Sequence, residues 1–390
     1  MSRIRLGYGL ASIALGGDPA ATGAHPKSMR YGVVFAVVVC AVTAGCASGR
    51  QSSTQPFPSS APAASAAAPR TQLVGAALAF DPARAAVLAF GGTVTLGGGS
   101  APSSATWQWD GTGWQTVDVG VAPPGRTRAL FAFDPSQQGL VLMDGQSETE
   151  SPPTCAPPTA AGQAGCTGAV SPVRDLTDGW LLSASGWHRI DVTGAPGLGW
   201  AAVGDPARRA LIVVGETQPP PQGHDGTWQH TGAGWALLSS TTPDYGATIG
   251  VDPISGRLIA YLGQSPYTPP SGYLAPAESG YTHTWELAPS GWQLLPPAAV
   301  PSMASGVLTP SPDGSQLLLV NTLGETWAWT GVTWSRYSTD NAPKLADAQS
   351  VAAATDTTHH LVVVVAVNNT TGDTTWTLSG HHWTRQPWTP

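Results

Sequence analysis

The segment TWQWDGTGWQTV, residues 106–117, places Trp107 and Trp114 seven positions apart across a Gly-rich turn. The same interval recurs in five more pairs, which are Trp180/Trp187, Trp228/Trp235, Trp285/Trp292, Trp327/Trp334 and Trp376/Trp383. Twelve of the sixteen Trp residues are used in this way, which chance placement of a rare residue would not produce. Self-similarity with a period of roughly 40–50 residues indicates a repeat architecture.

The residues ahead of each Trp pair also repeat. Each unit has an apolar segment, a short turn that often contains Asp-Pro, and a second apolar segment, as in GAALAFDPARAAVLAFGG (residues 75–92). Asp-Pro suits a type I turn, in which the Asp carboxylate caps the backbone behind it. The second segment is almost unbroken at 211–214, 317–320 and 361–367, as in strands that are covered on both faces. Each unit therefore predicts four strands, a to d, with the first Trp on strand c and the second on strand d.

The c–d hairpin fixes how the two indoles meet. If Asp110-Gly111 is a two-residue turn, Trp107 faces Trp114 directly across the hairpin. A bulged loop is expected in the second and fourth units, where the equivalent turn residues are Ser183-Ala184 and Ala288-Pro289. We interpret the Trp residues as packing between neighbouring sheets, because a sugar-stacking platform would not need the same pair in every repeat.

Four-stranded antiparallel units repeated radially form a β-propeller. Six units predict an all-β, six-bladed propeller over residues 73–390, with blades at about 75–125, 126–198, 199–243, 244–298, 299–344 and 345–390. The first blade starts at strand a and the last ends at strand d, so no blade is predicted to combine strands from both termini. The alternative is that residues 71–75 close the ring as an exchanged strand. A double Gly closing strand b, Gly91-Gly92, followed by two spaced aromatic residues, resembles the kelch repeat of galactose oxidase-like propellers, with Trp in place of the usual Tyr. That resemblance implies the fold and says almost nothing about function.

The N-terminal region predicts export. Residues 29–45 contain one Arg and an apolar run of signal-peptide length, and the start is either Met29 or Met1 with residues 1–28 as an upstream extension. The TAGC segment that ends at Cys46 resembles a bacterial lipobox, although Thr43 stands where Leu or Val is usual. An uncleaved anchor and an ordinary secreted protein are the alternatives. The Ser-, Ala- and Pro-rich residues 46–72 then predict a disordered tether, so we expect a protein that is lipid-anchored through Cys46 to the outer face of the bacterial membrane.

Charge and cysteine content exclude some partners. The net charge is −7, only 11% of residues are charged, and no basic stripe is present, so a nucleic-acid partner is not expected. Cys155 and Cys166 predict a disulfide in an exported chain, because they show neither CxxC spacing nor a nearby His for a metal site. The dipeptides His359-His360 and His381-His382 point to opposite sides of a strand, so no metal and no cofactor is expected.

Long b–c connections, at about 93–105, 146–178, 216–226 and 264–282, share one face with the d–a connections and place any binding surface there, around the central channel. The candidate binding residues on that face are Arg126, Arg128, Arg174, Asp175, Glu216, Tyr267, Tyr273, Glu278, Tyr281 and His283. The candidate catalytic residues are Glu148 with Glu150, as a carboxylate pair for glycoside hydrolysis, and His224 with Asp225, as a base and its orienting partner.

Three functions are compatible with this pattern. The first is a monomeric binding or scaffolding module for an envelope protein or a glycan. The alternative is an extracytoplasmic carbohydrate-active hydrolase or lyase with acidic residues at the channel mouth, and the third is a purely structural ectodomain. The segments HDGTW (224–228) and DGTGW (110–114) resemble the sialidase Asp-box but lack its Ser, and the Arg residues show no triad pattern. A copper radical site would need a Tyr–Cys crosslink, whereas the remaining Cys residues are expected to be paired.

Overall fold

The computed structural model describes residues 70–96, 99–147, 154–155, 166–167, 173–217, 224–264, 280–296, 301–345, 348, 350–368 and 372–387. These residues all belong to the unit Pro69–Pro390. The predicted signal peptide, the lipidated Cys46 and the tether up to residue 69 lie outside the described residues.

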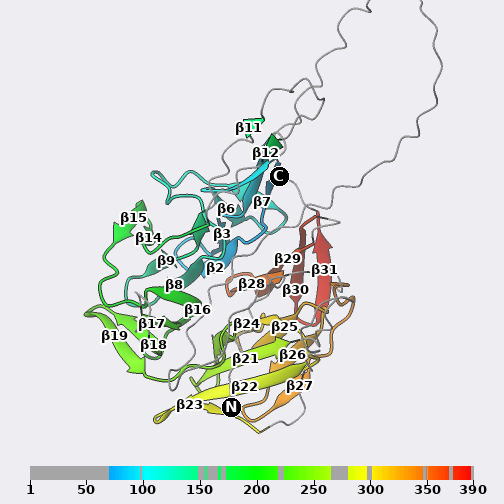
Figure 1. Ribbon diagram of the computed structural model, residues 1–390. Coiled ribbons are helices and arrows are strands. Elements are labelled where there is room, and N and C mark those ends of the chain that lie inside the picture. The colour runs from blue at the N-terminus through cyan, green and yellow to red at the C-terminus, as the bar shows by residue number, and fades with distance from the viewer. Residues whose placement is uncertain are drawn as a thin grey trace, which may run out of the picture. The chain divides into compact units, whose positions relative to one another are not determined.

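Six four-stranded antiparallel sheets follow one another along the chain, and each takes its strands in sequence order (Figure 1). Blade 1 consists of β2 (Ala77–Asp81), β3 (Ala86–Phe90), β6 (Thr106–Trp109) and β7 (Trp114–Thr116). Blade 2 consists of β8 (Leu130–Asp134), β9 (Gly139–Met143), β14 (Gly179–Ser183) and β15 (Gly186–Ile190). Blade 3 consists of β16 (Leu198–Asp205), β17 (Ala210–Glu216), β18 (Asp225–Thr231) and β19 (Gly234–Ser239).

Blade 4 consists of β20 (Thr248–Val251), β21 (Leu258–Gln264), β22 (Tyr281–Ala288) and β23 (Gly291–Leu294). Blade 5 consists of β24 (Gly306–Pro310), β25 (Leu317–Asn321), β26 (Thr326–Trp329) and β27 (Trp334–Arg336). Blade 6 consists of β28 (Ser350–Asp356), β29 (Leu361–Val367), β30 (Thr374–Ser379) and β31 (His382–Gln386). The first strands of successive blades touch one another in the order β2, β8, β16, β20, β24 and β28, and β28 returns to β2. The chain is therefore a six-bladed β-propeller, as the sequence predicts, and the contacts show that strand a is the innermost strand of each blade.

Short additional strands extend the connections of the first two blades. In blade 1, β1 (Arg70–Gln72) pairs with β4 (Thr93–Leu96), which also pairs with β5 (Gly99–Pro102). In blade 2, β10 (Gln146–Ser147) pairs with β13 (Arg174–Asp175), and β11 (Thr154–Cys155) pairs with β12 (Cys166–Thr167). The long b–c connections of these two blades are thus partly built as sheet.

The b strands form the core because neighbouring blades cover both of their faces. Val87, Leu211 and Val363 are at most 1% exposed, and each lies in an apolar cluster shared by two adjacent blades. The a–b turns are capped as predicted. The carboxylate of Asp81 accepts the N–H of Ala83 at 2.9 Å, and Asp134, Asp205, Asp252 and Asp356 cap their own turns in the same way.

The predicted register of the c–d hairpin is wrong. Trp114 pairs with Trp109, and Trp107 pairs with Thr116, so Trp107 and Trp114 are diagonal neighbours and do not face each other. The turn is Gly111-Thr112, one position later than predicted: the Asp110 N–H donates to the Gly113 carbonyl at 3.0 Å, and the Asp110 carboxylate accepts the N–H groups of Thr112 and Gly113 at 2.8 Å. In the second and fourth units, two-residue turns stand in place of the expected bulged loops. In each of the other blades, too, the second Trp lies opposite the residue two positions after the first Trp.

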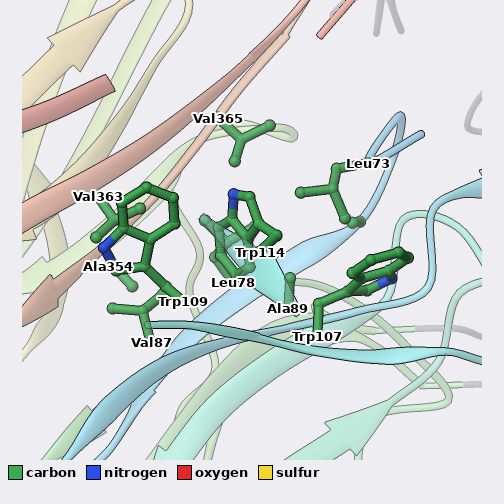
Figure 2. Close-up of a cluster of buried hydrophobic side chains, with 11 residues drawn as sticks. Leu73, Leu78, Val87, Ala89, Trp107, Trp109, Trp114, Ala354, Val363 and Val365 are labelled. Carbon is green, nitrogen blue, oxygen red and sulfur yellow. The ribbon is translucent and has the colours of Figure 1, made fainter. Parts of the chain in front are cut away.

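Packing and hydrogen bonds close the ring, and exchange of the segment 71–75 does not, because β1 pairs within blade 1. Trp109 and Trp114 of blade 1 lie in one apolar cluster with Val363 and Val365 of blade 6 (Figure 2). Beside it, the Leu73 N–H donates to Asp373 Oδ2 at 2.5 Å, and burial raises the pKa of that carboxyl although this hydrogen bond opposes the shift.

A hydrogen bond that we call the Trp–Thr link joins the blades. At the ring closure, Trp114 Nε1 on strand d of blade 1 donates to Thr375 Oγ1 on strand c of blade 6 at 3.0 Å. Four other junctions carry the same link, namely Trp187 to Thr106, Trp292 to Thr227, Trp334 to Thr284 and Trp383 to Thr326. The acceptor is always the Thr immediately before the first Trp of the preceding blade. Between blades 2 and 3, Gly179 takes that place, and Trp235 Nε1 is buried without a partner among the described residues.

Candidate functional site

The predicted functional face is built where the b–c and d–a connections meet. Thr127, in the connection from blade 1 to blade 2, forms an antiparallel bridge with Gln146, at the start of the b–c connection of blade 2. The two N–H···O bonds of this bridge measure 3.0 and 2.8 Å. Both kinds of connection therefore emerge on one face, as the sequence predicts, and the inner strands begin on that side.

The starts of the inner strands of blades 1 to 4 enclose a pocket of about 220 Å³. Its walls include Ala77, Ala129, Trp200, Ala201 and Ala247, and none of its described lining residues is ionisable. An innermost strand pairs on one side only, which leaves unpaired backbone N–H and C=O groups toward the channel. We call this the channel pocket: its side chains are apolar or uncharged, whereas its backbone is polar.

Trp200 is placed in the channel pocket by a β-bulge. Gly199 pairs with Gly215 and Ala201 pairs with Val214, so Trp200 is the extra residue of β16. Bulges commonly re-aim a side chain beside a functional site. At the same distance before the a–b turn, the other blades have small residues, which are Ala76, Ala129, Ala247, Gly306 and Val351. Trp200 thus breaks the repeat, because it places a large aromatic ring at a position where each of the other blades has a smaller side chain.

Aromatic and hydrogen-bonding groups extend from Trp200. The ring of Tyr245, whose residue is 44% exposed, lies 5.2 Å from the Trp200 ring. The preceding residue, Asp244, accepts a hydrogen bond from His283 with an Nδ1–Oδ2 distance of 3.0 Å. His283 in turn lies between Tyr281 and Trp285, at ring-centroid distances of 4.8 and 5.3 Å. Tyr281 and His283, both predicted as binding residues, are therefore brought together here.

The sequence prediction missed Trp200, Asp244 and Tyr245. A signal for Trp200 was available, because it is one of only four Trp residues outside the seven-residue pairs. Trp109 and Trp329 follow the first Trp of their blades by two positions, and Trp388 lies outside the described residues. Only Trp200 stands on an inner strand. Asp244 and Tyr245 gave no signal, since their partners are distant in the chain.

Arg126, predicted as a binding residue, is instead a buried structural residue with no exposed surface. Its guanidinium contacts both carboxylate oxygens of Asp178, at 2.8 and 3.1 Å. It also donates to the carbonyls of Asp144 and Pro124. Burial alone would raise the pKa of Asp178, but hydrogen bonds from Arg126 and Trp180 outweigh it and hold that pKa below its usual value. Because these partners enclose its guanidinium, Arg126 is not accessible to a ligand.

Asp144 lies beside this ion pair and is 3% exposed. Burial raises its pKa to about 7, although the Gly199 N–H and the Arg126 charge act in the opposite direction. Its Oδ2 accepts the Gly199 N–H at 2.8 Å, and its φ of 57° is in the left-handed region. Asp144 therefore holds the backbone that immediately precedes Trp200.

The remaining predicted residues do not converge on the channel pocket. Arg128, Arg174 and His224 are exposed, Asp175 accepts a hydrogen bond from Gln146, and Glu216 lies opposite Asp225 in the β17–β18 pairing. The candidates Glu148, Glu150, Tyr267, Tyr273 and Glu278 lie outside the described residues. At the predicted His224–Asp225 dyad, the His224 N–H donates to Thr217 Oγ1 at 2.9 Å, and the strand register brings Asp225 beside Glu216.

The backbone register bears on the cysteine pair. In the β11–β12 pairing, Cys155 lies directly opposite Cys166. The disulfide itself stays a prediction.

Among the described residues, no cluster of three or more His, Cys, Asp or Glu could hold a metal ion. Within the same residues, no helix has the length and apolar character needed to cross a membrane.

Comparison with known proteins gives likenesses of fold at low identity. No protein-family profile matches the chain, and no curated protein matches it. The structure of YjhT is 12% identical over 83% of this chain and 99% of that chain, with a TM-score of 0.45. AofleA from Arthrobotrys oligospora is 12% identical over 80% of this chain and 86% of its own, with a TM-score of 0.43. The SapL1 lectin in complex with alpha methyl fucoside is 14% identical over 82% and 98%, with a TM-score of 0.42. Likeness at this level carries no conclusion about ligand or activity.

Proposed function

We propose that this protein is a glycan-binding module that holds a neutral sugar ring in the channel pocket against Trp200. The observation that supports the proposal is the β-bulge that directs this one Trp into an uncharged pocket where every other blade has a small residue. Small-ligand sites in proteins are concave, aromatic or apolar in their walls, and supplied with a few polar groups that orient the ligand.

The chemistry of the pocket matches a sugar. An aromatic ring presents a negative π face, which attracts the weakly positive C–H groups on the apolar face of a pyranose. Tyr245 adds a second ring and a hydroxyl at the rim, 5.2 Å from Trp200. The unpaired backbone groups of the inner strands supply both donors and acceptors, which suit hydroxyl groups that can act as either.

The charge of the pocket argues for a neutral ligand. None of its described lining residues is ionisable, so a charged group that entered would lose its hydration without gaining an ion pair. An enzyme that hydrolyses glycosides needs two carboxyl groups about 5–10 Å apart, and the described lining residues offer none. The predicted pair Glu148 and Glu150 lies outside the described residues, so binding is the function that the described pocket supports.

We further propose that the propeller is exported and held at the outer face of the membrane through a lipid on Cys46. The support is the TAGC segment after an apolar run, followed by the Ser-, Ala- and Pro-rich stretch. The N-terminal peptide of the protein purified from membranes should carry acyl chains on Cys46, and mass spectrometry measures this. An unmodified Cys46 in the membrane fraction would contradict the anchor while leaving the binding proposal intact.

The binding proposal is tested on an array of neutral and acidic oligosaccharides with the purified full-length chain. Retention on neutral glycans, with no new reducing or unsaturated ends released, is the expected result. New chain ends would favour the carbohydrate-active enzyme. If no neutral glycan is retained, the proposal fails and an envelope protein becomes the partner to seek.

A further inference from the structure

A row of side chains continues from the channel pocket along the junction between blades 3 and 4. We call Trp200, Tyr245, Asp244, His283 and Tyr281 the seam row. They come from β16, from the connection between blades 3 and 4, and from β22, so segments far apart in the sequence meet there (Figure 1). Trp200 and Tyr281 also pack against one shared apolar cluster between the two blades.

The seam row is continuous. Trp200 contacts Tyr245, and Asp244 and Tyr245 are neighbours in the chain, with Cα atoms about 3.8 Å apart. Asp244 binds His283 at 3.0 Å, and the Tyr281 ring lies 4.8 Å from the His283 ring. Aromatic faces therefore occur at both ends of the row, and a carboxylate–imidazole pair lies between them.

We infer that the outer part of the seam row, Asp244, His283 and Tyr281, is a second subsite, and that the ligand is an oligosaccharide of at least two sugar units. This inference rests on the proposed function of the channel pocket. The first unit lies against Trp200, and the next lies over Tyr245 toward His283. A ligand of this length uses aromatic surface that a single sugar ring in the channel pocket leaves uncovered.

The Asp244–His283 pair gives the second subsite its hydrogen bonds. Both side chains are partly exposed, at 42% and 36%, and within the described part of the chain each has a polar atom with no other bond, Asp244 Oδ1 and His283 Nε2. The hydrogen bond through Nδ1 fixes the imidazole plane, as a carboxylate commonly does for a working His. A carboxylate oxygen beside a ring nitrogen can accept from one sugar hydroxyl and bond to its neighbour, so the pair is suited to adjacent hydroxyls.

The charge of the second subsite selects among sugars. Among the described residues that form the seam row, Asp244 is the only acidic side chain and His283 is the only one that can become a cation. Because an acidic sugar would meet the Asp244 carboxylate, uronic and sialic acid units are disfavoured at this position, whereas neutral and amino sugars are accepted. Asp244→Asn removes this repulsion and keeps an acceptor oxygen for His283.

The test measures the dissociation constants of the full-length chain for neutral gluco-, manno-, galacto- and fuco-configured saccharides of one to four units. For the series that binds, the wild-type affinity should rise by about tenfold from one unit to two, which corresponds to about 1.4 kcal/mol. In His283→Ala and in Tyr281→Ala this ratio should fall toward one. His188→Ala, an exposed His bonded to Ser183 and Ser185 on blade 2, is the matched control and should keep the wild-type ratio.

The outcomes separate the two proposals. If the wild type binds no saccharide of any length, the proposed function fails, and the second subsite with it. If single units bind as tightly as longer ones, or if both seam variants keep the wild-type ratio, the second subsite is overturned and the channel pocket stands. Thermal melting of each variant shows whether it is folded, and Asp244→Asn adds an independent readout, because it should strengthen binding of a uronic acid-containing disaccharide.

Discussion

Trp114 Nε1 lies 3.0 Å from Thr375 Oγ1, and this hydrogen bond joins the first blade of the propeller to the last. The two residues are separated by 261 positions in the chain, and both are buried. A ring that is closed without strand exchange depends on such contacts, because nothing covalent or sheet-like holds its ends together in the described residues. The Trp–Thr link therefore gives a direct way to test how the propeller closes.

Thr375→Val should destabilise the propeller by about 1–3 kcal/mol, because Val keeps the shape of Thr but leaves the buried Trp114 N–H without an acceptor. Urea unfolding followed by Trp fluorescence measures the change. Thr116→Val, on the exposed outer strand of blade 1, is the control and should change stability by less than about 0.5 kcal/mol. Equal effects of the two substitutions would show that the link does not hold the closure.

Asp144→Asn should alter how stability depends on pH. In the folded chain Asp144 keeps its proton up to pH about 7, whereas the unfolded chain releases it near the ordinary value of 3.8. Between these values the folded state binds more protons, so this group makes the protein less stable as pH rises. Asn cannot ionise, retains an acceptor for the Gly199 N–H and tolerates the left-handed φ of 57°.

The variant should therefore match the wild type at low pH and exceed it above pH 7. The upper limit of the difference is about 4 kcal/mol, at about 1.4 kcal/mol per pKa unit. Thermal or urea unfolding at several pH values measures it. Stability curves for the two proteins that run parallel across the whole range would contradict the burial effect on Asp144.

Gly256→Ala should cost about 1 kcal/mol. Gly256 closes the a–b turn of blade 4 with a φ of 67°, and an added Cβ would meet no atom within 4 Å, so the cost is purely conformational. Ala85 holds the equivalent place in blade 1 with a φ of 50°. Ala85→Gly should then be neutral or stabilising, although this change usually destabilises. Unfolding of both variants in urea gives the comparison, and a loss of stability in Ala85→Gly would contradict it.

Cys155 and Cys166 should form a disulfide when the protein is made in an oxidising compartment, because the β11–β12 register places them directly opposite each other. Mass spectrometry of the non-reduced protein should show a crosslinked peptide pair that separates on reduction. The double variant Cys155→Ser, Cys166→Ser is the control for assignment of that pair. Free thiols on both residues in protein from the oxidising compartment would contradict the prediction.

The sequence predicts the fold well because each residue type that repeats has the same physical role in every blade. Trp pairs pack between blades, Asp residues cap the a–b turns, and unbroken apolar runs form strands covered on both faces. The Thr before the first Trp was equally visible, and its replacement by Gly179 marks the one junction that lacks the Trp–Thr link. The role of this Thr could not be predicted, because the Trp that donates to it belongs to another repeat.

The features that the sequence did not predict depend on contacts between distant segments. The predicted hairpin register is wrong because the turn lies one residue later in every blade than the dipeptide at the centre of each Trp pair indicates. The bulge at Trp200 depends on how β16 pairs with β17, and periodicity alone does not reveal it. Arg126 has the sequence context of a surface residue, and only its enclosure with Asp178 shows that it is structural. Asp244 and His283 come together across 39 positions of the chain.

The role of Trp200 in sugar binding is tested by the affinity of Trp200 variants for the neutral glycan that the wild type retains, measured by isothermal titration calorimetry. Trp200→Leu should lose binding by about tenfold or more, since an aromatic face contributes roughly 1 kcal/mol beyond its buried area and its area is lost too. Trp200→Phe keeps a ring and should retain part of the affinity, while Leu294→Ala, exposed on the outer strand of blade 4, should bind as the wild type does. Wild-type affinity in a folded Trp200→Leu variant would show that the sugar is bound somewhere other than the channel pocket, and the proposed site would be wrong.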